Sequence, residues 1–155
     1  MCPTNDEQSG NRDLIHRFTE ECWNHGDLTK VMELVAADCR HDDPVFPHIA
    51  AGAEGLQRHI SRIRRAFPDL KFTITDENYG ADNAEVQWSA SATQVAEFLG
   101  ISPRDQRAAI TGKSIYRIEA GKIVENRMSW DVISLMQQLG SAAAGQHVEP
   151  WSRAS

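Results

Sequence analysis

The spacing of hydrophobic residues changes near position 70 of the chain. Before that point they recur every three or four residues, which is the period of an amphipathic helix. The pattern predicts three helices, whose buried positions are Leu14, Ile15, Phe18, Cys22 and Trp23, then Leu28, Val31, Met32 and Val35, then Leu56, Ile60, Ile63 and Phe67. Asp27 can cap the second helix, Pro68 ends the third, and residues 41–52 are expected to form a loop between them.

Beyond position 70 the hydrophobic residues alternate with polar ones, which is the period of a strand. Residues 70–78, 84–95, 108–118 and 122–130 are predicted strands, and a tight turn at Gly121 joins the last two. A short helix follows, with Val132, Leu135 and Leu139 on one face, and it is expected to end at Gly140. Helices and strands are thus segregated along the chain, which indicates an α+β domain over residues 11–140 with flexible tails at 1–10 and 141–155.

Composition limits the classes of function. The 155 residues suffice for one domain, and a net charge of -6 argues against nucleic acid or an anionic membrane as a partner. The sequence has neither an apolar run of about 18 residues nor a signal peptide, so we expect a cytoplasmic protein. Three helices covering one face of a curved sheet would leave a cone-shaped cavity, which is where chemistry would take place.

Six segments carry a resemblance to a known family. They are FTEECWNHGDL, HDDP, GLQRHISRIRRAFPDL, EFLGISP, YRIEAGKIVE and LMQQLG. In their order and spacing the chain resembles the SnoaL-like polyketide cyclases over residues 12–140. That family belongs to the superfamily of cone-shaped α+β domains that includes nuclear transport factor 2 and ketosteroid isomerase. The resemblance implies a homodimer or higher oligomer, a pocket for a polycyclic or polyketide-like molecule, and neither a metal nor another cofactor.

The resemblance also implies a catalytic acid at the end of the last strand, which maps onto Asp131. A carboxylate can remove a proton from carbon when neighbouring carbonyl groups make that proton acidic. Met128 and Trp130 would give it partly apolar surroundings, which raise a carboxyl pKa. Asp131 also stands where a residue would cap the final helix. Catalyst and cap both stay open, as does a combination of the two.

Further candidates for the site follow from position. The family commonly has a polar residue facing the cavity at the place of His41, so the resemblance implies that His41 donates a hydrogen bond to a substrate carbonyl; the alternative is that it simply bonds Asp42 or Asp43. Trp88 and Tyr116 are predicted on one face of the sheet, where aromatic rings stack on a flat substrate or fill the core. Three positions where the family often carries histidine hold other residues here, namely Gln94, Ser114 and Asn126. They keep hydrogen-bonding capacity but have lost the imidazole.

Three functions remain open from the sequence. The first is aldol ring closure of a polyketide ester by acid–base catalysis. The second is hydroxylation of a polycyclic polyketide without metal or flavin, assisted by a reductase partner, and the missing histidines raise this alternative. The third is a non-catalytic module that uses the cone for ligand binding or dimerisation.

Overall fold

The fold is taken from a computed structural model that describes residues 5–43, 46, 52–103 and 105–144. The N-terminal half is helical except for one strand, with α1 (Asn5–Arg17), the π-helix η1 (Phe18–Asn24), α2 (Leu28–Leu34), β1 (Val35–Asp42) and α3 (Gly52–Ala66). The second half contains β2 (Lys71–Tyr79), β3 (Asn83–Thr93), β4 (Arg107–Glu119), β5 (Lys122–Trp130) and α4 (Val132–Ala144). The predicted order of helices followed by strands is confirmed.

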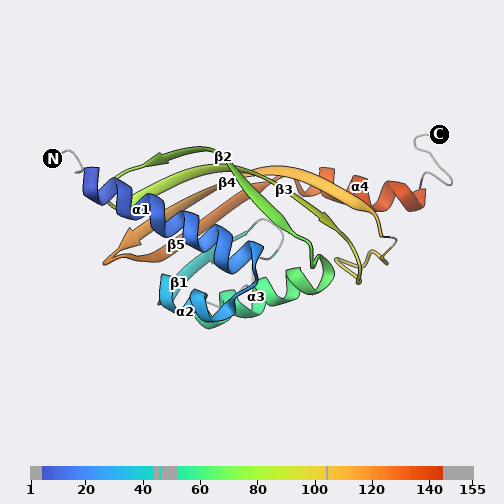
Figure 1. Cartoon of the computed structure of the whole chain (residues 1–155). Helices are drawn as coiled ribbons and strands as arrows, with labels where there is room; N and C mark the ends of the chain where they lie inside the picture. Colours follow the sequence, from blue (N-terminus) through green and yellow to red (C-terminus); the bar gives the residue numbers. More distant parts are fainter. Residues whose placement is uncertain (1–4, 44–45, 47–51, 104, 145–155) are drawn as a thin grey trace.

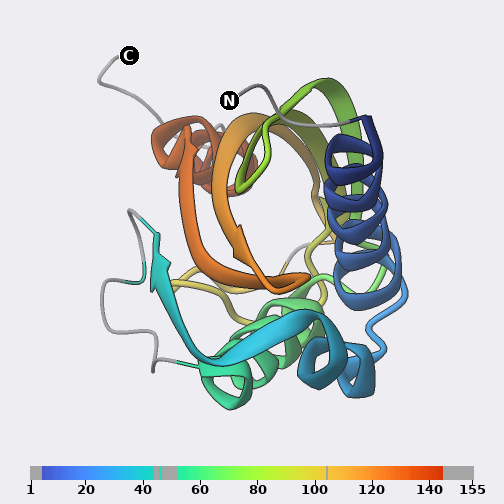
Figure 2. The same ribbon diagram turned by 90° about the vertical axis from the view of Figure 1, so that its left-hand side faces the viewer.

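The described residues form a five-stranded sheet in the order β1-β5-β4-β3-β2. Strands β2 to β5 are the predicted antiparallel meander. Figure 1 shows the long strands side by side, and the end-on view of Figure 2 shows them curling strongly, with α1 across the open side of the curl. The predicted α+β cone, three N-terminal helices on a curved sheet, is therefore confirmed.

One strand of the sheet was not predicted. Residues 35–42 form β1, which pairs in parallel with β5. Val35 was expected on the buried face of the second helix, but that helix ends at Leu34, and Val35 is buried as the first residue of the strand. Met32 was also predicted to be buried and is 46% exposed. The helical period had been continued past Leu34, where the chain changes from helix to strand.

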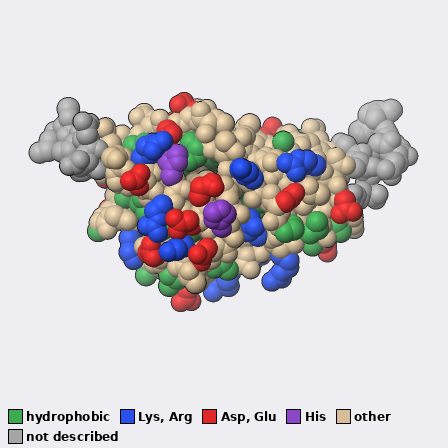
Figure 3. All heavy atoms as spheres, viewed as in Figure 1, with side chains coloured by type: hydrophobic (Ala, Val, Ile, Leu, Met, Phe, Trp, Pro, Cys, Tyr) green, Lys and Arg blue, Asp and Glu red, His purple; other side chains and the backbone are tan. Residues whose placement is uncertain are grey.

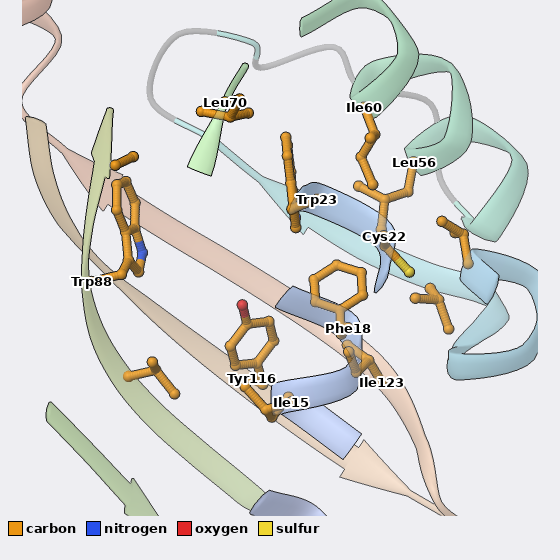
Figure 4. Close-up of a cluster of buried hydrophobic side chains, with 14 of the residues drawn as sticks. Ile15, Phe18, Cys22, Trp23, Leu56, Ile60, Leu70, Trp88, Tyr116 and Ile123 are labelled. Atoms are coloured by element: carbon orange, nitrogen blue, oxygen red, sulfur yellow. The ribbon is translucent and has the colours of Figure 1, made fainter. Parts of the chain in front are cut away.

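The core lies between the helices and the concave face of the sheet. Phe18 of η1 is fully buried and meets Tyr116 of β4 edge to face, with ring centroids 6.1 Å apart. Figure 4 shows Trp88 and Tyr116 projecting from their strands toward the helix that carries Phe18 and Trp23. Helix α3 adds Leu56 and Ile60 from the other side, because its apolar residues share one face.

The N-terminal helix begins at Asn5, inside the segment predicted to be a tail. The side-chain amide of Asn11 donates to the carbonyls of Gly80 and Ala81, which fixes α1 to the turn after β2. On the face shown in Figure 3, acidic and basic side chains are interspersed. Arg17 of α1 forms ion pairs with Glu21 and Glu33. No described helix is long and apolar enough to cross a membrane.

Helix α4 continues to Ala144, past the predicted end at Gly140, and residues 145–155 of the predicted tail lie outside the described part of the chain. The side chain of Gln138 attaches this helix to β4. Its amide nitrogen donates to the carbonyl of Ala109 and its oxygen accepts from the Ala109 N–H, each at 2.7 Å. Strand β5 reaches only as far as Gly112 along β4, so Gln138 supplies the backbone partners that a longer β5 would have supplied.

We expect Gln138→Ala to loosen α4. The substitution removes two hydrogen bonds to β4, which corresponds to about 1–2 kcal/mol because both bonds are near solvent. Amide hydrogen exchange of residues 132–140, followed by mass spectrometry, should become faster while exchange in β3 is unchanged. Gln137→Ala, at the exposed neighbouring position, is the matched control. Equal protection of α4 in both variants would show that Gln138 does not hold the helix.

Candidate active site

The concave side of the sheet encloses an apolar cavity. Its walls are mainly aromatic and aliphatic side chains, among them Trp23, Phe67, Phe72, Trp88, Phe98 and Trp130. Leu135 of α4 closes one side, so the helix attached by Gln138 forms part of the wall. The cavity volume is about 80 Å³, whereas pockets for drug-sized ligands measure roughly 300–1,000 Å³. A substrate with several fused rings therefore requires surrounding side chains to move outward.

Two tryptophans and a glycine form a row across the cavity floor. Trp88 of β3 and Trp130 of β5 both pair in register with Gly112 of β4. A Cβ atom at Gly112 would lie 2.4 Å from Cζ2 of Trp88, so the indole occupies the space that a side chain would need. The indole Nε1–H of Trp88 donates to Oγ of Ser114 at 3.0 Å, which fixes the ring orientation. Glycine is thus required at position 112 for Trp88 to lie against the sheet.

A buried carboxylate faces this apolar space. Asp43, the first residue after β1, is only 5% exposed and lines the cavity. The indole N–H of Trp130 donates to both of its oxygens at 3.4 Å, a long and shared hydrogen bond. In the sequence Asp43 had been considered only as a partner for His41. Nothing in the local pattern distinguished it from its neighbour Asp42, which is exposed.

His59 of α3 is the second side chain of the cavity that can take part in acid–base chemistry. It is 4% exposed and lines the same cavity, although the sequence suggested that it would be only partly buried and gave it no role. Its ring packs edge to face against Phe46 and Trp23, with centroids 4.9 and 6.0 Å away. Burial lowers the pKa of His59 to about 4. Its position beside the apolar stripe of Leu56, Ile60 and Ile63 was the reason to expect only partial burial.

The predicted catalyst, Asp131, lies elsewhere. Its side chain is exposed and accepts a hydrogen bond from the backbone N–H of Ser134 at 2.9 Å. This is the geometry of a helix cap, one of the two alternatives left open above. Together with Thr111, Lys113 and Ser129, Asp131 borders a second, more polar groove, which shares Trp88 and Trp130 with the cavity. Its catalytic role stays a prediction.

His41 and Gln94 make hydrogen bonds to the backbone. Nε2–H of His41 donates to the carbonyl of Gly52 at 3.0 Å, which links β1 to the start of α3 rather than to Asp42 or Asp43. Burial lowers the His41 pKa. The buried side-chain amide of Gln94 donates to the carbonyls of Ala96 and Ile101, at 3.0 and 2.7 Å. The contacts of Gln94 stabilise the connection after β3. Neither His41 nor Gln94 lines the cavity.

The remaining sequence candidates divide between two places. Met128, like Trp88 and Trp130, lines the main cavity. Ser114 and Tyr116 line a narrow extension of it that shares Trp88 and Met128. Asn126 is buried on β5, and its Oδ1 has no hydrogen-bond partner among the described residues. The face of the sheet that was predicted to carry Trp88 and Tyr116 thus lines the cavity and its extension.

The charge available in the cavity is small. Among its described lining residues, only Asp43 and His59 can ionise, and no Lys or Arg is present. Within the described residues, no three His, Cys, Asp or Glu side chains are grouped so that they could hold a metal ion. The arrangement provides a carboxylate and an imidazole in surroundings that exclude water. Such groups suit proton transfer to and from carbon and oxygen atoms.

Solved structures similar to this chain share its cone fold. TsrD from Streptomyces laurentii is 26% identical, with a TM-score of 0.78 over 86% of this chain and 97% of TsrD. IdmH from Streptomyces antibioticus, a proposed polyketide cyclase, is 27% identical, with a TM-score of 0.71 over 83% of this chain and 97% of IdmH. AclR from Streptomyces galilaeus, a proposed hydroxylase, is 22% identical, with a TM-score of 0.75 over 86% of this chain and 98% of AclR.

A search of curated proteins finds no significant match to the sequence. The profile of one protein family, by contrast, matches residues 13–139, which is most of the chain and contains every described residue that lines the cavity. This chain belongs to the SnoaL-like polyketide cyclase family.

Proposed function

We propose that this protein catalyses aldol ring closure of a polyketide-like ester, with Asp43 as the general base. The observation that carries the proposal is the buried Asp43 carboxylate, which lines an otherwise apolar cavity and is oriented by Trp130. The likeness to IdmH, a proposed polyketide cyclase, supports this reaction class. The likeness to AclR, at 22% identity, supports the fold alone.

Ring closure requires two proton transfers and one new carbon–carbon bond. Asp43 takes a proton from the carbon between two carbonyl groups. The resulting enolate attacks a third carbonyl group of the same molecule. The alkoxide that forms then receives the proton back from Asp43, so atoms and charge balance. The indoles of Trp88 and Trp130 provide flat apolar surfaces against which a folded aromatic substrate can stack. An enclosed site holds the two reacting carbons together and keeps water away from the enolate.

The alternatives from the sequence differ in measurable ways. A hydroxylase would add oxygen and raise the mass of the product, whereas ring closure followed by loss of water would lower it. A purely structural module would not need an ionisable group inside its cone, and the cavity with Asp43 favours an enzyme. The homodimer and the reductase partner stay predictions.

The proposal can be tested without the natural substrate. The probe is 2-tetralone, a flat bicyclic ketone with exchangeable protons beside its carbonyl. In D2O the protein should accelerate deuterium incorporation at the carbon next to the carbonyl, because a base in an apolar site removes the proton there reversibly. Proton NMR follows the incorporation. Incorporation at the buffer rate would contradict acid–base chemistry in this cavity. With an aromatic polyketide ester, mass spectrometry of the product then separates ring closure from hydroxylation.

A further inference from the structure

His59 is the second ionisable group of the cavity and has no part in the proton transfers described above. Its Nδ1 is buried and has no hydrogen-bond partner among the described residues. A polar atom buried in this way costs free energy, and native structures seldom keep one without a reason. Because Nδ1 is sealed, the rest of the ring, which carries Nε2, is the part available to line the cavity.

The unpartnered Nδ1 indicates which tautomer the ring adopts. A neutral imidazole carries one N–H and one bare nitrogen, so one nitrogen is a donor and the other an acceptor. Buried N–H groups without partners are rarer in proteins than unsatisfied acceptors. The less costly arrangement therefore leaves Nδ1 bare and places the proton on Nε2. The aromatic contacts with Phe46 and Trp23 hold the ring in this orientation.

The surroundings also keep the ring uncharged. Burial is the main cause of its low pKa, and Arg62 on the same helix and His41 on β1 lower the pKa further. Asp43 lines the same cavity. A neutral imidazole is a weaker acid than an imidazolium. It can therefore donate a hydrogen bond to an oxygen that is becoming negative and still keep its own proton.

We propose that Nε2–H of His59 is the hydrogen-bond donor for the enolate oxygen of the substrate. This inference rests on the proposed function, in which Asp43 removes the proton from carbon. As that proton leaves, negative charge moves to the carbonyl oxygen, and the His59 N–H stabilises it there. Asp43 thus acts at the carbon that loses its proton, and His59 acts at the oxygen that becomes negative. His59 keeps its proton throughout, so no further base or acid is needed to restore it.

A binding experiment tests the donor independently of catalysis. The probe is 2-naphthol, a flat phenol whose oxygen resembles an enol oxygen, with affinity measured by titration calorimetry. We expect His59→Phe to weaken binding about tenfold, because it keeps an aromatic ring but removes the donor. His59→Gln, which keeps an N–H donor, should recover most of the affinity. Arg58→Ala, on the exposed side of the same helix, should bind as the unmodified protein does. Equal affinity for His59→Phe and the unmodified protein would overturn the proposal.

Two further readouts separate this proposal from the one on Asp43. His59→Phe should lower the maximal rate of 2-tetralone exchange roughly 100-fold, since loss of one such donor has an effect of this size. If the protein does not accelerate exchange at all, the function proposed for Asp43 fails, while the naphthol result still decides the donor. Nitrogen-15 NMR should show the Nε2–H tautomer and no protonation of His59 from pH 8 to pH 5.5. A ring that becomes charged in that range would refute the neutral donor.

Discussion

Asp43→Asn is expected to lower the rate of 2-tetralone exchange by roughly 10²–10⁴-fold, the contribution typical of a positioned general base. Asparagine has nearly the same shape and can still accept from the Trp130 indole, but it cannot take up a proton at neutral pH. The measurement is deuterium incorporation under saturating probe, with circular dichroism to verify that the fold is retained. Binding of 2-naphthol should persist, since the cavity keeps its shape and His59.

Asp131→Asn is the matched comparison. It is the same substitution at the aspartate that the family resemblance implied, and asparagine is an equally good helix cap. We expect exchange at close to the unmodified rate, because Asp131 is exposed outside the cavity. The opposite pattern, with Asp43→Asn active and Asp131→Asn inactive, would restore Asp131 as the catalyst and remove Asp43 from the mechanism.

Gly52→Ala is expected to cause the largest loss of stability, about 3 kcal/mol or more. Gly52 begins α3 with φ +90°, a conformation that side chains disfavour by roughly 1–2 kcal/mol. A Cβ there would also lie 2.2 Å from the carbonyl oxygen of Ala37 in β1, so strand or helix must shift. The shift would also disturb the His41 bond to the Gly52 carbonyl. Urea unfolding followed by tryptophan fluorescence measures the loss.

Gly100→Ala separates the two causes. Gly100 has φ +80°, and no atom lies within 4 Å of a Cβ built on it. This variant should therefore show only the conformational cost, about 1–2 kcal/mol. The difference between the two variants then reports the clash with Ala37. Equal losses would mean that β1 and α3 adjust freely at their crossing.

Most elements of the fold could be predicted because their hydrophobic periods are clear. Strand β3 alternates along its whole length, the turn at Gly121 marks the hairpin of β4 and β5, and α3 has a complete apolar face. Strand β1 was missed because its buried positions do not alternate, and its register with β5 shifts between Val35 and Arg40. A parallel edge strand of this kind is specified by its distant partner, which no local pattern reveals.

The candidate site was predicted less completely than the fold. Alternation placed Trp88 and Tyr116 on one face of the sheet, and both line the narrow extension of the cavity, because side-chain direction along a strand is a local property. Burial of Asp43 depends instead on contacts from β5, including an indole 87 positions away. His59 was expected to be only partly buried, and both its burial and the absence of a partner for its Nδ1 among the described residues appear only when the strands and helices are assembled.

The row of Trp88, Gly112 and Trp130 restricts how this cavity can be altered by substitution. A methyl group at position 112 meets the indole of Trp88, so a library that varies this glycine alone would yield mostly damaged proteins. Shortening Trp88, to leucine for example, removes only part of the obstacle, because the Cβ would still lie 2.9 Å from the backbone carbonyl oxygen of Ser129 in β5. A side chain at position 112 therefore requires changes in both neighbouring strands, in β3 at Trp88 and in the β5 backbone at Ser129.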